Sequence, residues 1–180
     1  MLTELDVLKD VTQKFEKLNF QYMLTGSLAM SYYAQPRMTR DIDLVVNIVP
    51  TMVENMESVF ASDYYISVDS IHDAIQNEFI FNLIHIKSLI KIDCIVKKND
   101  EYRISEFERR KKIRLTDFEI FIVSKEDLII SKLIWFRESG SEIQKKDIKN
   151  LLNSGYENDY LLNWLRKLNL NEQFQAVTDE

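Results

Sequence analysis

The sequence predicts an α/β (α+β) fold in which helices flank a mixed sheet and a helical lobe follows at the C-terminus. Short apolar segments of strand character alternate with amphipathic helical segments as far as about residue 123, and beyond it the apolar residues recur only at helical spacing. The chain holds only 3 Gly and 2 Pro, and no stretch has the composition of a linker. We therefore expect an α/β core at 1–123 with a helical lobe at 124–180 packed on it as one unit.

The predicted core begins with a helix and with a strand that ends at a Gly-Ser turn. Apolar residues at helical spacing predict an amphipathic helix at about 3–18, which we interpret as scaffold. The aromatic-rich segment 20–25 predicts a strand that Gly26 ends. Ser27 is then placed to cap a short helix at 28–33, whose first backbone N–H groups would be free to bind an anion.

Two later strands carry three carboxylates. In the strand predicted at 41–47, Asp41 and Asp43 point to the same face because side chains alternate along a strand. Asp93 interrupts the otherwise apolar strand predicted at 89–96 and joins them if the two strands are neighbours. Carboxylates side by side repel one another, and a bound divalent cation is the usual resolution. Mg²⁺ suits such a site because it accepts one or two carboxylates, several waters and substrate phosphates as ligands.

The remaining elements follow from the same periodicities and from capping residues. Ser124-Lys125-Glu126-Asp127 has the pattern of a capping box before an apolar helix. In chain order we expect a helix through 52–60, a short strand near 64–68, a helical piece at 71–75, a strand at 79–85, a helical stretch ending in the basic run 109–112, a strand at 119–123, and helices at 128–137, 143–152 and 160–168.

Charge and cysteine content restrict the class of protein. A net charge of −6 argues against a general nucleic-acid coat, although the basic run 109–112 with Arg114 could form a local patch. The lone Cys94 allows no internal disulfide, fits a reducing cytosol and is expected in the core. Residues 1–6 have no signal-peptide character and no run is long enough to span a bilayer, so we expect a cytoplasmic protein with no membrane partner.

The order of these motifs resembles the nucleotidyltransferase fold of the DNA polymerase β superfamily. The signature of that family is a Gly-Ser turn, a short helix, an Asp-x-Asp strand and a third Asp on a later strand; here these are Gly26-Ser27, 28–33, Asp41-Ile42-Asp43 and Asp93. The helical part also resembles the AbiEii-type branch, toxins of toxin–antitoxin systems, in which a Lys and a basic-Asp motif follow. Here these are Lys132 and the Asp147 of Gln144-Lys145-Lys146-Asp147. The resemblance covers about residues 18–152.

This resemblance implies an enzyme that moves a nucleoside monophosphate (NMP) from a nucleoside triphosphate (NTP) to a hydroxyl acceptor, with two Mg²⁺ ions. It assigns catalysis and metal binding to Asp41, Asp43 and Asp93, with Asp93 the better candidate for the base, and it assigns phosphate contacts to Gly26, Ser27 and Lys132. Arg37 and Arg40 flank the carboxylates and are further candidates for phosphate contacts, unless they pair with neighbouring acids.

Several alternatives stay open at this point. The acceptor is RNA, a small molecule or a protein; one hypothesis is a toxin that a partner antitoxin inhibits, and a second is an antibiotic-modifying enzyme of the aminoglycoside type. A third is a catalytically silent module that binds a nucleotide or a partner. Lys132 could merely snorkel and Asp147 could be a surface carboxylate. Both histidines are interpreted as structural or surface residues, and Trp135, Phe136 and Trp164 as core.

Overall fold

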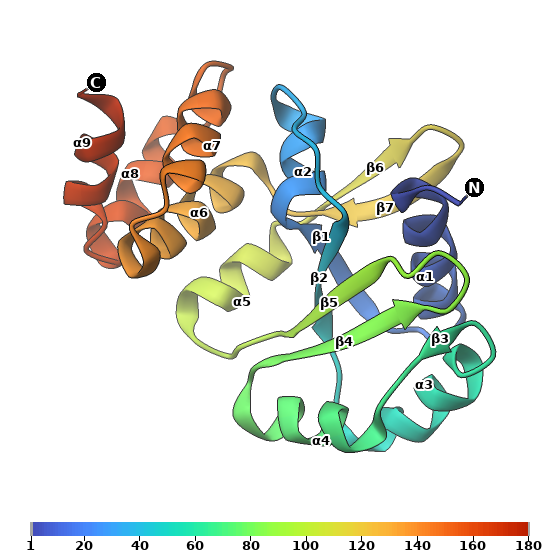
Figure 1. Ribbon diagram of the computed structural model, residues 1–180. Coiled ribbons are helices and arrows are strands. Elements are labelled where there is room, and N and C mark those ends of the chain that lie inside the picture. Colours follow the sequence, from blue (N-terminus) through green and yellow to red (C-terminus); the bar gives the residue numbers. More distant parts are fainter. Residues whose placement is uncertain (1, 180) are drawn as a thin grey trace.

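A mixed seven-stranded sheet runs through the computed structural model, which describes residues 2–179 (Figure 1). The strand order is β3-β4-β5-β2-β1-β7-β6. β2 is parallel to β5 and β1 is parallel to β7, whereas the other neighbours are antiparallel. The predicted fold class is confirmed. The strands are β1 (Gln21–Thr25), β2 (Asp41–Asn47), β3 (Tyr64–Tyr65), β4 (Ile80–His85), β5 (Lys91–Val96), β6 (Lys111–Leu115) and β7 (Phe118–Ile122).

Helices cover the sheet, and those of the C-terminal part gather at one end of the molecule, farthest from α1 and α3 (Figure 1). In that group α6 packs against α7, α8 and α9, and it also contacts α2 of the α/β core. No described helix has the length and apolar composition needed to cross a membrane. The helices are α1 (Glu4–Lys17), α2 (Gly26–Tyr33), η1 (Pro50–Met52), α3 (Val53–Phe60), α4 (Val68–Asn77), α5 (Glu101–Glu108), α6 (Lys125–Ser139), α7 (Glu142–Leu152), α8 (Asn158–Lys167) and α9 (Asn171–Thr178).

The central strands separate an apolar face from a polar one. In β2 the side chains of Ile42, Leu44 and Val46 are buried, and the residues between them are not. The same alternation holds in β5, because Ile92, Cys94 and Val96 are buried and the intervening residues are only partly covered. Burial of one face fixes the register of both strands, since a slip of one residue would turn the apolar side chains to the wrong side. The carboxylates are therefore held on the other face.

The first helix is fixed at its start and along its buried face. The side chain of Thr3 accepts a hydrogen bond from the backbone N–H of Asp6, and the Asp6 carboxylate accepts one from the backbone N–H of Thr3, which forms a capping box. On the inner face Phe15 packs on Phe60, with ring centroids 5.4 Å apart. This helix is scaffold, as the sequence predicts.

Two elements differ from the sequence-based prediction. The basic run does not end a helix, because α5 ends at Glu108 and Lys111–Leu115 forms the edge strand β6. In β6 only Ile113 and Leu115 are partly buried, and the charged residues around them obscure the alternation that would indicate a strand. Charged side chains are common on edge strands, where they discourage pairing with other chains. The second difference is the short helix α9, which the prediction lacks and whose one buried residue is Val177.

Candidate functional site

Four strands bring polar side chains into one row across the sheet. Because β2 and β5 are parallel neighbours, Asp43 lies directly opposite Asp93. Thr25 of β1 is opposite Asp43 on one side, and Asn82 of β4 is opposite Asp93 on the other. The Asn82 amide donates a hydrogen bond to Oδ1 of Asp93. The sequence-based prediction did not include Asn82, although a polar residue in the middle of the apolar strand β4 carries the same signal as Asp93 in β5.

The environment of Asp43 disfavours its negative charge. Burial, followed by the negative charges of Asp93 and Asp41, raises the pKa of Asp43 to about 6. The positive charge of Lys132 and a hydrogen bond from the backbone N–H of Ser27 oppose this rise. The side chain of Asp93 is 19% exposed and that of Asp41 is 54% exposed, so the three carboxylates run from a covered to an open position. A cation bound here would relieve the repulsion.

Gly26 lets the start of α2 approach Asp43 closely. Its φ angle is +64°, and a Cβ atom at this position would lie 2.0 Å from Oδ2 of Asp43. No other residue type has room there without moving the carboxylate. The Gly-Ser turn therefore places the first backbone N–H groups of α2 beside the acidic row, which is the arrangement that an anion accompanied by a cation would need.

A pair of glycine substitutions tests this close approach. Gly140 has nearly the same φ angle, +63°, but a Cβ there would meet no atom within 4 Å. We expect Gly140→Ala to lower the free energy of unfolding by about 1 kcal/mol, the conformational cost alone. Gly26→Ala should cost about 2 kcal/mol more because the Cβ displaces Asp43. Urea denaturation measures both, and equal costs at the two glycines would refute the close approach.

The donor chemistry of the acidic row fits a hard divalent cation, although the row does not enclose one. Within residues 2–179 no three His, Cys, Asp or Glu side chains lie close enough together to ligate one ion. Nζ of Lys91 instead lies 2.9 Å from Oδ2 of Asp93 and 3.9 Å from Oδ1 of Asp41. Two carboxylates with phosphate oxygens and waters satisfy Mg²⁺. The residues therefore fit Mg²⁺ that is bound jointly with a phosphate-bearing ligand.

A buried cluster next to this row joins the helical part to the start of α2. Lys132 of α6 is 6% exposed, and its Nζ lies 2.7 Å from Oδ2 of Asp147 and 3.1 Å from Oε1 of Gln144, both on α7. Arg37 donates from Nε to both carboxylate oxygens of Asp147, at 3.1 and 3.2 Å, and from Nη2 to Oγ of Ser27, at 2.5 Å. Burial lowers the pKa of Lys132, and the hydrogen bond and charge of Asp147 counteract this.

The structure thus brings together most of the residues that the sequence singles out. Ser27, Lys132 and Asp147 share one network, and the charge of Lys132 acts on Asp43. Of the two arginines, Arg37 pairs with an acid, and Arg40 is exposed on the loop before β2.

One aromatic residue departs from its predicted place in the core. Trp135 is 59% exposed on α6, whereas Trp164 is buried as expected. The cause lies in α6 itself, whose charged and apolar residues are spread around the helix instead of forming two faces, so periodicity does not indicate which face is covered.

The first arginine of the basic run is turned toward acidic residues. Arg109 donates from Nη2 to Oε2 of Glu157, at 3.0 Å, and from Nε to Oδ2 of the fully buried Asp127, at 3.3 Å. Its guanidinium lies 3.6 Å from the ring centroid of Tyr160. These contacts tie α5 to α6 and α8, so Arg109 serves the fold and is not available to phosphates.

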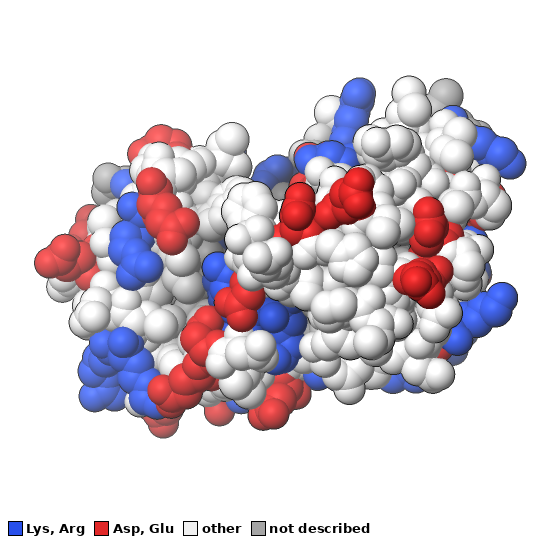
Figure 2. All heavy atoms as spheres, turned by 90° about the horizontal axis from the view of Figure 1, so that it is seen from below, with Lys and Arg blue, Asp and Glu red and all other residues white. Residues whose placement is uncertain are grey.

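Two further members of the basic run are also engaged within the protein. The guanidinium of Arg110 lies over the ring of Phe107, 4.3 Å from its centroid, and Nζ of Lys112 lies 2.6 Å from Oε2 of Glu119. On the face drawn in Figure 2, seen from the side of α4, acidic and basic side chains are interspersed among uncharged ones. Arg109, Arg110 and Lys112 each contact an acidic or aromatic side chain of the protein, and this weakens the case for an RNA patch.

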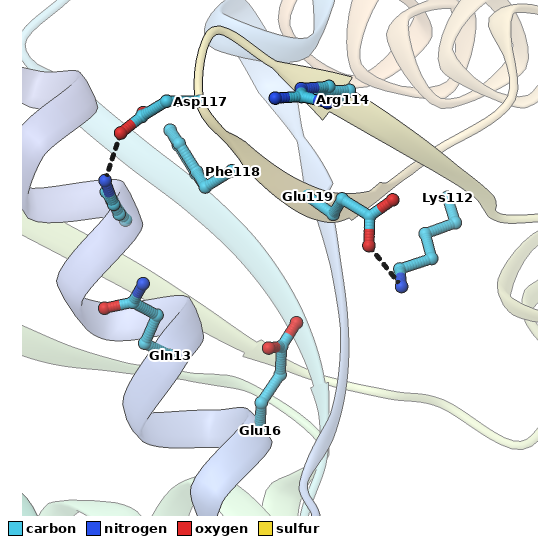
Figure 3. A pocket seen from close by; sticks show the side chains of 8 residues that line it. Gln13, Glu16, Lys112, Arg114, Asp117, Phe118 and Glu119 are labelled. Atoms are coloured by element: carbon cyan, nitrogen blue, oxygen red, sulfur yellow. Dashed lines mark hydrogen bonds and ion pairs between the residues drawn. The ribbon is translucent and has the colours of Figure 1, made fainter.

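A hollow of about 450 Å³ lies on other elements, between α1 and the β6–β7 hairpin (Figure 3). Four of its charged side chains form two ion pairs, Lys9 with Asp117 at 2.5 Å and Lys112 with Glu119. None of the predicted site residues lines it. We assign it no role.

Solved structures share the architecture of this chain but little of its sequence. An antigenic nucleotidyltransferase-like protein from Paracoccidioides brasiliensis matches 98% of this chain and 97% of its own, with a TM-score of 0.55 and 18% identity. The lincosamide antibiotic adenylyltransferase LnuA, solved with lincomycin bound, matches 83% of this chain and 96% of its own, with a TM-score of 0.54 and 18% identity. The antibiotic-resistance factor ANT(2'')-Ia, solved in solution, matches 94% of this chain and 92% of its own, with a TM-score of 0.59 and 11% identity. No protein-family model matches the chain, and neither does any curated protein sequence.

Proposed function

Because this chain has the nucleotidyltransferase fold, we propose that it transfers an NMP group from an NTP to a hydroxyl group of an acceptor, with Mg²⁺. The observation that carries the proposal is the pairing of Asp43 with Asp93 across two parallel strands, directly beside the Gly26-Ser27 start of α2. Repelling carboxylates next to the start of a helix suit a metal-bound triphosphate. The cation would satisfy the carboxylates, and the backbone N–H groups that follow Ser27 in α2 would satisfy the phosphates.

In the proposed reaction the acceptor oxygen forms a bond to the α-phosphorus, and the bond from that phosphorus to the bridging oxygen of the leaving pyrophosphate breaks. Asp41, Asp43 and Asp93 would hold Mg²⁺, which when bound would neutralise phosphate charge and acidify the acceptor hydroxyl. Asp93 is oriented by the amide of Asn82 and accepts the proton of the acceptor hydroxyl. The hydroxyl of Ser27 and the backbone N–H groups that follow Ser27 in α2 donate to phosphate oxygens.

The buried cluster around Asp147 has a positioning role in this proposal. Asp147 pairs with both Lys132 and Arg37, and Arg37 reaches Ser27. The carboxylate of Asp147 therefore holds two cations at the edge of the phosphate site. Arg37 can exchange its bond with Ser27 for a phosphate oxygen, because an arginine side chain presents several donors in a fixed fork.

A small molecule is the acceptor that the surface favours over RNA. RNA recognition depends on exposed cations that contact phosphates, and Arg109, Arg110 and Lys112 are engaged with acidic or aromatic side chains of the protein. The net charge of −6 suits a cationic acceptor. LnuA, one of the similar structures, is an antibiotic adenylyltransferase, and an antibiotic-like acceptor is thus our first candidate. The toxin that modifies RNA and is inhibited by an antitoxin, the first hypothesis from the sequence, becomes the second candidate.

Label transfer distinguishes these acceptors. The protein is incubated with each α-labelled NTP and Mg²⁺ in the presence of total RNA, cell protein or a panel of hydroxylated cationic small molecules. We expect label in the small-molecule fraction and none with Asp41→Ala/Asp43→Ala. Label in RNA instead would replace the antibiotic hypothesis with the toxin hypothesis. If a folded protein binds NTP and labels no fraction, the silent-module hypothesis is correct.

A further inference from the structure

Lys91 occupies a place among the carboxylates that neither the sequence motifs nor the proposed reaction assigns. It lies on β5 two residues before Asp93, on the same face, and is directly opposite Asp41 of β2. Its ammonium group lies 2.9 Å from Asp93 and 3.9 Å from Asp41. One side chain of this protein therefore places a positive charge between two of the three acidic groups.

We propose that Lys91 is a positioning residue that acts as a built-in cation: it holds Asp41 and Asp93 together in the metal-free protein and competes with a divalent ion for them. The inference rests on the proposed function, because it takes the acidic row to be a metal site. Three carboxylates on one face repel one another, and the ammonium group at hydrogen-bond distance from Asp93 offsets part of that repulsion.

The side chain of Lys91 is suited to leave when a metal ion arrives. It is 42% exposed, so solvent is open to the displaced ammonium group. A lysine is a compact point charge on a flexible stem, which can turn away without moving the strand that carries it. The backbone ladder between β2 and β5 would keep the carboxylates in register during this exchange. The divalent ion must displace one positive charge, so its affinity for the nucleotide-free protein is reduced.

Binding of Mn²⁺ alone tests the competition, with electron paramagnetic resonance as the readout and no nucleotide present. We expect Lys91→Met to bind Mn²⁺ at least 10-fold more tightly than the wild type, and Lys91→Arg to bind it about as weakly as the wild type. Lys98→Met is the matched control, since Lys98 is an exposed lysine beyond the end of β5 and its loss removes the same charge. Without metal, Lys91→Met should melt about 2 °C below the wild type, and saturating Mn²⁺ should remove that difference.

The outcomes separate the role of Lys91 from the proposed function. If folded Lys91→Met binds Mn²⁺ no more tightly than the wild type, while Asp43→Asn still weakens binding, the role of Lys91 is wrong and the metal site stands. If Asp43→Asn leaves Mn²⁺ binding unchanged, the acidic row is not the metal site, and both proposals fail. If Lys98→Met binds Mn²⁺ as tightly as Lys91→Met does, the gain in affinity comes from the more negative net charge of the protein and not from the position of Lys91, which would overturn the inference.

Discussion

Asp43→Asn is expected to make the metal-free protein more stable by about 1–3 kcal/mol at pH 8, a gain that follows from a pKa shift of about two units. Asp43 has its pKa raised from 3.8 to about 6 by burial and by the neighbouring carboxylates. At pH 8 the folded protein must therefore carry a charge that its surroundings disfavour. Asparagine removes that charge and keeps a side-chain oxygen that can accept the hydrogen bond from the N–H of Ser27.

The pH dependence of this gain has a definite sign. A carboxyl group whose pKa is higher in the folded state binds its proton more tightly there, so its contribution to stability is complete below about pH 3.8 and is lost as the pH rises through about 6. Wild type and Asp43→Asn should therefore have similar stabilities at pH 3.5 and diverge up to pH 7.

Urea denaturation in EDTA across this range measures the difference. Asp73→Asn, which changes an exposed carboxylate of α4, is the control and should show no such divergence. Mg²⁺ should then stabilise the wild type more than Asp43→Asn. If the variant is less stable than the wild type at pH 8, the view that Asp43 is held in an unfavourable environment is wrong.

Asp147→Ala is expected to cost about 3–5 kcal/mol of folding free energy, the usual effect of removing one partner of a buried ion pair. The variant leaves the ammonium group of Lys132, 6% exposed, without its carboxylate, and Arg37 loses the same partner. Thermal or urea denaturation measures the loss. Asp159→Ala, at an exposed position in the first turn of α8, removes a carboxylate with no such consequence and should cost much less.

A double variant separates the structural role of Asp147 from its role at the site. Lys132→Met/Asp147→Leu removes both charges and fills similar volume, so it should recover most of the lost stability. Its activity should stay low, since nothing then holds Arg37 beside Ser27. If the double variant regains full activity together with stability, Asp147 and Lys132 have only a structural role.

Local sequence signals predict the parts of the site that depend on local geometry. The alternation of side chains along a strand places Asp41 and Asp43 on one face. A helix does start at the Gly-Ser pair, but it begins at Gly26 with Thr25 as the N-cap residue, so the expectation that Ser27 caps a helix at 28–33 is wrong. The approach of Asp93 to Asp43 requires only that β2 and β5 be neighbours, as they are. For these residues short-range rules are sufficient.

Other contacts depend on register and packing, which no short-range pattern contains. Asn82 reaches Asp93, and Lys91 lies opposite Asp41, because of the way β4, β5 and β2 are aligned. The partner of Lys132 is set by how α6 packs on α7. Because charged and apolar residues are not segregated around α6, its sequence does not indicate that Trp135 is exposed. The edge strand β6 is not predicted from the sequence because charged residues occupy most of its positions and leave no clear apolar alternation.

The central claim is that the acidic row beside Gly26-Ser27 performs nucleotidyl transfer. The most direct measurement follows pyrophosphate release and labelling of the acceptor, with and without Mg²⁺. It compares the wild type with Asp43→Asn and with Asp73→Asn. The account predicts transfer by the wild type and by Asp73→Asn that requires Mg²⁺, and at least a 1000-fold lower rate for Asp43→Asn, about 4 kcal/mol of transition-state stabilisation. Transfer by Asp43→Asn at the wild-type rate, or by the wild type in EDTA, would contradict it.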